Sequence, residues 1–305
     1  MLFRSLEKTD KAAAQQVVER ALAVAPSTQR QRRLGVLALD NKDFGRAEAA
    51  FRRAVEKDRT GFFKSHDDYA GLAKSCVEQG KTQEALAAVK DMGNAFSPSP
   101  ELTARQAAVE SQVQFHAGNA RAGQAALEKA QAIRKETGLG AAAALEIAQA
   151  CFAGGDQEGA KQIIEAVAED HAENDQILAQ AQSVFAAAGL HDEGTVFLEA
   201  TRKRMIKLNN DAVTLARAGS LDEATAMLTE AADRLLNNCQ VSVNAALALL
   251  MHMQTRGMDP DRLAAARRYI LQARSANPEH PKLAEVTAFY AKLAPPEAAL
   301  PPEEG

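Results

Sequence analysis

A unit of two amphipathic helices joined by a glycine turn recurs along most of this chain, and it restricts the fold more than any other feature. Its clearest copy runs from Leu208 to Leu235, with the sequence LNNDAVTLARAGSLDEATAMLTEAADRL. Large apolar residues recur at helical spacing on both sides of the turn Ala218-Gly219-Ser220. Small residues, such as Ala212 and Ala224, stand where the two helices must touch. The stretch therefore predicts a tightly packed helical hairpin.

The turn of this unit has counterparts at regular intervals. Successive turn glycines are 38, 37, 34 and 30 residues apart; they are Gly80, Gly118, Gly155, Gly189 and Gly219. Asn41-Lys42-Asp43 takes the place of the glycine in the unit before them. Such a period is typical of solenoids, in which each unit buries its apolar face against its neighbours. Because strand-type runs of β-branched residues are missing, we predict an all-α solenoid of about seven to eight repeats.

The repeats suggest how the chain is divided. We expect the solenoid to span residues 1–294, with a degenerate repeat at 102–137 and a terminal capping helix at 281–293. The sixth repeat is expected to end near Met205 and the seventh to begin at Leu208. The Pro-rich, acidic tail at 295–305 is predicted to be disordered. All ten prolines fall in linkers, at helix ends or in this tail, which supports these boundaries.

The segment from Thr28 to Asp58 carries a family resemblance. Its second helix has Phe51 between Ala47 and Ala54, and its first helix has the large–small pair Leu34-Gly35. Gly35 allows two backbones to approach, and we expect Phe51 to fill the gap toward the next repeat. Over roughly residues 10 to 280 the chain resembles the tetratricopeptide repeat family. The resemblance implies a right-handed superhelix whose first helices line a concave groove for a peptide or helix of a partner protein.

A narrower resemblance concerns three stretches, RRLGVLALDNKDFGRAEAAFRRAV, HDDYAGLAKSCVEQGKTQEAL and NNDAVTLARAGSLDEA. Together they are similar to the output region of bacterial response regulators, in which a phospho-accepting receiver domain precedes the repeats. This resemblance implies the effector half of a signalling protein, because these 305 residues hold no receiver.

The distribution of charge raises an alternative function. The net charge is −4, but residues 1–64 hold 14 Lys and Arg against 8 Asp and Glu, a balance of +6. Basic residues also cluster at Arg30, Arg32 and Arg33 and at residues 202–207. A nucleic-acid-binding helical repeat is therefore the second hypothesis. No aromatic residues interleave with the basic ones, which favours solvated helix faces instead.

The residues give no positive sign of catalysis, of a metal site or of a cofactor. The motifs G-x-S-x-G, H-E-x-x-H and the P-loop are absent, and the six histidines are scattered, as expected of surface or turn residues. The three cysteines show no ligand spacing, and Cys76 and Cys151 occupy equivalent apolar positions, as core residues would. Together with the charged start of the chain, this usage leads us to expect a cytoplasmic, non-enzymatic protein with no membrane segment.

One polar pattern remains as a candidate site. The residue two before the small inter-helix position of the first helix is polar in four consecutive repeats: Glu146, Gln180, Asn210 and Asn244. Lys74, Gln112 and Gln149 lie about one turn away on the same side of their helices. Stacked amides can hold an extended peptide because each both donates and accepts hydrogen bonds. Solvated helix faces are the simpler explanation, so both interpretations stay open. No motif identifies the partner or the oligomeric state.

Overall fold

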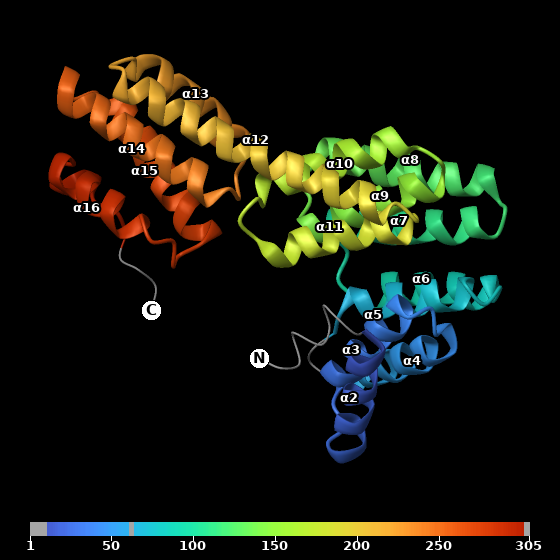
Figure 1. Cartoon of the computed structure of the whole chain (residues 1–305). Helices are drawn as coiled ribbons and strands as arrows, with labels where there is room; N and C mark the ends of the chain where they lie inside the picture. Colours follow the sequence, from blue (N-terminus) through green and yellow to red (C-terminus); the bar gives the residue numbers. More distant parts are fainter. Residues whose placement is uncertain (1–10, 61–63, 302–305) are drawn as a thin grey trace. The chain divides into compact units, whose positions relative to one another are not determined.

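A computed structural model of the chain describes residues 11–60 and 64–301. Within them, consecutive α-helices run back and forth (Figure 1). The helices are α2 (Lys11–Val24), α3 (Thr28–Asp40), α4 (Phe44–Thr60), α5 (His66–Val77), α6 (Thr82–Ala95), α7 (Pro100–His116), α8 (Ala120–Glu136), α9 (Ala141–Ala153), α10 (Gln157–Asp170), α11 (Asp175–Ala187), α12 (His191–Arg217), α13 (Leu221–Arg234), α14 (Cys239–Arg256), α15 (Pro260–Ala276) and α16 (Leu283–Leu293). The predicted all-α repeat architecture is confirmed, whereas the handedness of the superhelix stays a prediction.

The helices form two compact units, and each is described by itself. The first unit ends at Ile163 and the second begins at Ile164, so the boundary falls inside α10. In each unit, neighbouring helices of the chain pack in pairs, such as α3 with α4, α7 with α8 and α14 with α15. The degenerate segment 102–137 therefore still supplies a regular pair. Among the described residues, none of the helices combines the length and apolar character needed to cross a membrane.

The predicted turns have one common geometry. The five turn glycines all have positive φ, from 73° at Gly80 to 87° at Gly219, and Lys42 adopts φ 59° in the turn that lacks glycine. In each turn the next residue donates its N–H to the carbonyl five residues earlier, as Lys81 does to Cys76 at 2.9 Å and Asp43 does to Ala38 at 2.8 Å. This bond closes a Schellman motif, in which a left-handed residue ends the helix. The prediction that Asn41-Lys42-Asp43 replaces a glycine turn is confirmed.

The core of the first unit depends on Phe51, whose ring lies between two helices. A Cβ atom added to Gly35 would lie 2.7 Å from the ring, and one added to Gly71 would lie within 2.6 Å of three ring carbons. The side chain is almost fully buried. The expectation that Phe51 fills the gap toward the next repeat is therefore confirmed. The three cysteines are buried and free, including Cys76 and Cys151 as expected.

The break predicted between the sixth and seventh repeats is wrong. Residues 191–217 form one helix, α12, which pairs with α11 through one part and with α13 through another. The first helix of the seventh repeat is thus continuous with the second helix of the sixth. The physical reason is local: between Gly194 and Gly219 there is no glycine or proline, and long helix-forming side chains fill the expected junction.

Residues 295–301 of the Pro-rich tail make contacts with α15 and α16, and the disorder expected of the whole tail stays a prediction. Pro296–Ala298 form a 3-10 turn, and the hydroxyl of Tyr290 donates to the carbonyl of Ala298 at 2.8 Å. Arg274 donates to the carbonyl of Pro301 at 3.0 Å, and Leu300 packs against the core that α14, α15 and α16 share. The composition of residues 295–301 is typical of disorder. In the structure, two hydrogen bonds and the apolar contacts of Ala298 and Leu300 hold these residues against the core. Residues 302–305 lie outside the described part of the chain.

Candidate functional site

Four of the predicted site residues meet in the first unit. Lys74 on α5 lies 2.6 Å from a carboxylate oxygen of Glu146 on α9, and it donates to the side-chain oxygen of Gln149 at 2.7 Å. Gln112 on α7 donates to the side chain of Glu146 at 3.0 Å and to its backbone carbonyl at 3.2 Å. We call Lys74, Arg105, Gln112, Glu146 and Gln149 the inner network. It joins the first helices of three successive repeats.

The inner network is centred on a buried carboxylate. Glu146 is 8% exposed and Lys74 is 25% exposed. Burial by itself raises the pKa of Glu146, but the positive charges of Lys74 and Arg105 outweigh it and lower that pKa below its usual value. Glu146 therefore stays ionised at neutral pH. Arg105, itself buried, lies 3.7 Å from Glu146 and also pairs with Asp67.

A second buried ion pair joins α3 to α5. Arg32 donates to both carboxylate oxygens of Asp68, at 2.8 and 2.6 Å, and Asp68 is fully buried. The sequence favoured a solvated helix face for the basic cluster that contains Arg32. That interpretation was incomplete, because Arg32 pairs with Asp68 one repeat away, as Arg105 does with Asp67. The separation of 36 residues between Arg32 and Asp68, about one repeat period, was the available signal.

The remaining predicted residues do not share one environment. Gln180 and Asn210 are exposed, whereas Asn244 is buried. Asn244 donates to the side chain of Asn209 at 2.8 Å and accepts from Gln240 at 2.9 Å. The predicted ladder of Glu146, Gln180, Asn210 and Asn244 thus contains two buried and two exposed members. Asn209, the neighbour of a predicted residue, is the partner that sequence reasoning missed.

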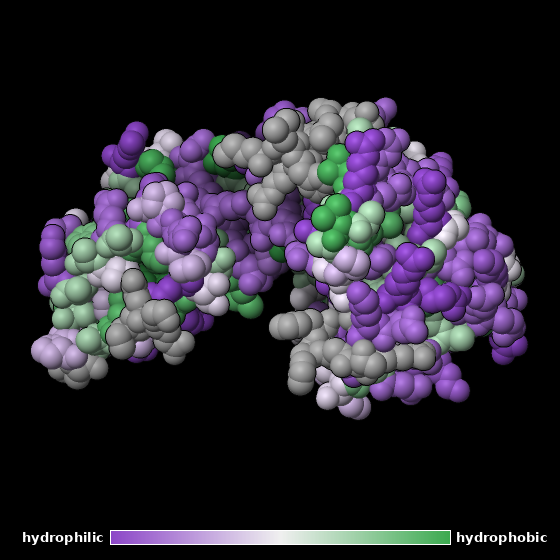
Figure 2. All heavy atoms as spheres, turned by 90° about the horizontal axis from the view of Figure 1, so that it is seen from below, coloured by the Kyte–Doolittle hydropathy of each residue, from purple (hydrophilic) through white to green (hydrophobic). Residues whose placement is uncertain are grey.

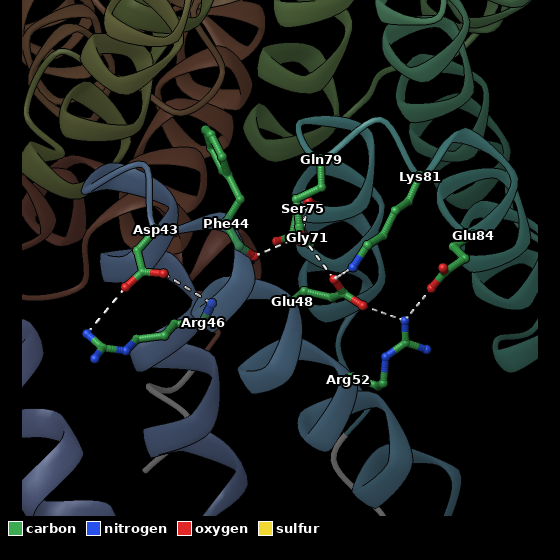
Figure 3. Close-up of polar contacts among 10 residues, drawn as sticks. All are labelled: Asp43, Phe44, Arg46, Glu48, Arg52, Gly71, Ser75, Gln79, Lys81 and Glu84. Carbon is green, nitrogen blue, oxygen red and sulfur yellow. Dashed lines mark hydrogen bonds and ion pairs between the residues drawn. The ribbon is translucent and has the colours of Figure 1, made fainter.

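A further polar cluster lies where α4, α5 and α6 meet (Figure 3). Glu48 accepts hydrogen bonds from Lys81 at 2.6 Å, from Arg52 at 2.7 Å and from Gln79 at 2.9 Å. Arg52 also contacts Glu84 at 2.8 Å. Burial raises the pKa of Glu48, but the hydrogen bonds from Lys81, Arg52 and Gln79 lower it more strongly, to about 2. The cluster ties α4 of one repeat to α6 of the next and to the turn that precedes α6.

This pKa gives a stability prediction. A carboxylate with a folded-state pKa near 2, against an ordinary 4.5, stabilises the fold above about pH 4.5 and loses that contribution as the pH falls toward 2. Because Arg52 and Lys81 are partly exposed, we expect about 1–3 kcal/mol. The difference in unfolding free energy between the unmodified chain and Glu48→Gln should shrink across this window in urea titrations. A difference that does not change from pH 6 to pH 2.5 would contradict the assignment.

Two histidines differ from the sequence expectation. His252 and His280 are buried rather than at the surface, and His252 lies 2.7 Å from Asp222. His280, Cys239 and Glu173 each place one potential ligand atom within 4.8 Å of the others. Burial, with the charge of Glu173, raises the pKa of the Cys239 thiol to about 12. The absence of a metal site stays a prediction.

Three of the basic residues that supported the nucleic-acid hypothesis have acidic partners. Arg32 pairs with Asp68, as described above. Arg204 pairs with Glu165, and Lys207 lies 2.5 Å from Asp211. These carboxylates reduce the positive potential that a phosphate backbone would meet. Residues 1–10 lie outside the described residues, and their two basic and two acidic residues balance.

Comparison with known proteins gives similarity of fold. No family model matches the chain, and no curated protein matches it. Solved structures of tetratricopeptide repeat proteins do. The Cut9–Hcn1 hetero-tetramer of APC/C matches at 13% identity and TM-score 0.39, over 94% of this chain and 48% of that one, so this chain spans about half its length. A tetratricopeptide repeat protein from Parabacteroides merdae matches at 12% identity and TM-score 0.33, over 94% of each chain.

A third match is the TPR2AB domain of yeast Sti1 in complex with pHSP90, at 15% identity and TM-score 0.32, over 87% of this chain and 97% of that one. The chain is thus similar to tetratricopeptide repeat proteins. With TM-scores below 0.5, no site residue is transferred from these structures. The fold described above rests on the helix pairs and turns of this chain.

Proposed function

We propose that this chain is a non-catalytic scaffold that binds a segment of a partner protein where α5, α7 and α9 carry the inner network. The observation that supports the proposal is that Lys74, Gln112 and Gln149 come together from three successive first helices. Amides and an ammonium group at repeat spacing suit the backbone carbonyls and carboxylates of a peptide. The Sti1 and Cut9 structures are complexes with other proteins, which accords with this class of function.

Lys74 is the residue assigned to contact the partner. It is the most exposed charged member of the inner network, and Glu146 keeps Arg105 as a second partner if Lys74 turns away. A partner carboxylate or carbonyl can therefore replace the contact between Lys74 and Gln149 without leaving Glu146 unpaired. Gln149, released from Lys74, then offers a further hydrogen bond to the bound backbone.

The test is capture of a partner from a lysate of the source cells, followed by titration of the captured protein. Lys74→Ala combined with Gln149→Ala should weaken binding by about tenfold, which corresponds to about 1.4 kcal/mol. Lys129→Ala, an exposed lysine on the second helix α8, is the matched control and should change nothing. If the unmodified chain, the double variant and the Lys129→Ala control bind the partner with equal affinity, this face is not the binding site.

Other sequence hypotheses stay predictions that the same capture addresses. A receiver domain among the captured proteins would support the role of a response-regulator effector. Binding of random RNA or DNA that falls steeply with salt would instead favour the nucleic-acid alternative. Gln180 and Asn210, which are exposed in the second unit, stay separate predictions that alanine variants of each would test.

A further inference from the structure

Three potential metal ligands of different chemical kinds meet in the second unit. Glu173 lies in the turn between α10 and α11, Cys239 is the first residue of α14, and His280 lies between α15 and α16. A carboxylate oxygen, the thiol sulfur and an imidazole nitrogen all lie within 4.8 Å of one another. We call these three residues the Cys–His–Glu cluster. They come from segments far apart in the sequence, so their spacing formed no motif.

The segments that carry the cluster are joined by contacts of their own. The side chain of Asn238 donates to the carbonyl of Glu169 at 2.9 Å, which ties the start of α14 to the end of α10. The thiol of Cys239 lies 3.8 Å from the carbonyl of Asn277, which follows α15. Cys239 is 2% exposed and His280 is 8% exposed. Packing therefore holds two of the three ligands near their final positions before an ion binds.

A second group of potential ligands shows that proximity alone does not make a metal site. Glu48, Cys76 and Glu84 in the first unit also place their ligand atoms within 4.8 Å of one another. Both carboxylates already have cationic partners, because Arg52 contacts both and Lys81 contacts Glu48. The positive charge that an ion would add is thus already present, and we assign no metal to this group.

Glu173 lacks the positive partner that Glu48 and Glu146 have. Within the described part of the chain, no lysine or arginine forms an ion pair with it; its partners are the backbone N–H of Gln240 and the ring of His280. Burial raises the pKa of Glu173 above its ordinary value. Charged residues are common on this protein, and the face in Figure 2 is mostly hydrophilic. A carboxylate alone would therefore indicate nothing, but the adjacent thiol and imidazole set this one apart.

We propose that Glu173, Cys239 and His280 bind one Zn²⁺ ion, with water as the fourth ligand. The site goes beyond the function proposed above, because it lies in the second unit, away from the inner network. Sulfur, nitrogen and one carboxylate oxygen suit Zn²⁺, whereas Mg²⁺ and Ca²⁺ prefer oxygen ligands. Ligand atoms of a tetrahedral zinc site lie about 3.3–3.6 Å apart, so these must approach by no more than about 1.5 Å. The exposed Glu173 can supply much of this movement.

Zinc binding exchanges protons and hydrogen bonds for metal bonds. Burial raises the pKa of Cys239 to about 12, so its thiol is protonated at neutral pH. Zn²⁺ takes the place of the thiol proton, which passes to water, as a thiolate–zinc bond forms. His280 binds as the neutral imidazole and gives up the long hydrogen bond, 3.3 Å, that its Nδ1 accepts from the backbone N–H of Lys282. The ion then compensates the thiolate and Glu173, and it ties three connections between helices together.

The experiment uses the full chain, stripped of metal by a chelator and titrated with Co²⁺. A thiolate bound to Co²⁺ gives a charge-transfer absorption in the near ultraviolet. One Co²⁺ per chain should produce it, and Zn²⁺ should remove it by displacement. Cys239→Ser should abolish the absorption, whereas Cys151→Ser, a change at another buried free cysteine, should retain it. Zn²⁺ should raise the unfolding temperature of the unmodified chain but not that of Cys239→Ser.

Glu173→Gln keeps the size of an exposed side chain, so it tests the site even if Cys239→Ser does not fold. It should weaken Zn²⁺ binding by at least about tenfold. Glu279→Gln, the same change at an exposed residue beside His280, should leave binding unchanged. The proposal is wrong if Co²⁺ gives no charge-transfer absorption, if the absorption persists in Cys239→Ser, or if the two glutamine variants bind Zn²⁺ equally. Absorption lost in Cys76→Ser would instead assign the ion to the group in the first unit.

Discussion

Replacing Gly71 by alanine is expected to destabilise the first unit by about 1–3 kcal/mol, although glycine-to-alanine changes inside helices usually stabilise. The added methyl group would overlap the ring of Phe51. The ring cannot move away freely, because Gly35 of the same repeat as Phe51 also lies close to it, at 2.7 Å from an added Cβ. The urea midpoint followed by circular dichroism measures the loss.

Gly45 provides the matched control for this change. It lies in α4, and a Cβ atom added there meets no atom within 4 Å. Gly45→Ala should therefore stabilise, by a few tenths of a kcal/mol up to about 1 kcal/mol. Phe51→Leu should recover part of the stability lost in Gly71→Ala, since the smaller side chain frees space. If Gly71→Ala and Gly45→Ala shift the midpoint in the same direction, Phe51 does not fill the space between the repeats as described.

Replacing Glu146 by alanine should cost about 3 kcal/mol, because removing one partner of a buried ion pair leaves the other charge uncompensated. Arg105 would keep Asp67, but Lys74 and Gln112 would each lose a partner held at 3.0 Å or less. The cost should persist in high salt, since buried pairs are screened much less than exposed ones. Urea unfolding at two salt concentrations measures both properties.

An exposed carboxylate in the same unit supplies the comparison. Glu158 is 83% exposed and lies 3.8 Å from Lys161. Glu158→Ala should change the unfolding free energy by less than about 0.5 kcal/mol. Lys74→Ala should fall between the two variants, because the quarter of its side chain that is exposed already contacts water. A loss below 1 kcal/mol for Glu146→Ala would mean that the inner network adds little to stability.

The turns and the local packing of the repeats could be predicted because short segments encode them. A glycine that follows an apolar helix end indicates a residue in the left-handed conformation. Lys42 adopts the same conformation at the equivalent place in its repeat, although it is not a glycine. In the same way, the small residues on either side of Phe51 in the sequence indicated that its ring would fill the gap toward the next repeat. The same local logic failed at residue 205, where an expected boundary had no helix-breaking residue to create it.

The candidate site was only partly predictable, because its contacts join residues of different repeats. Lys74 and Gln112 were selected as solvent-facing polar residues, but pairing with Glu146 buries much of this surface. Asn244 was placed on a groove, yet it is buried and paired with Asn209. Helical periodicity identifies the face of a helix, whereas the partner on that face depends on how adjacent repeats are rotated. That rotation is set by the whole interface.

The continuity of α12 also bears on how a chain like this can change by insertion and deletion. A residue inserted in a glycine turn lengthens a loop, which costs little. One residue inserted near Met205 would instead rotate everything after it by about 100° and shift it by about 1.5 Å along the helix axis. The buried residues Gly194 and Thr201 would then no longer share one face of α12 with Ala212. The sixth and seventh repeats are therefore expected to be duplicated or lost together, as one inherited block.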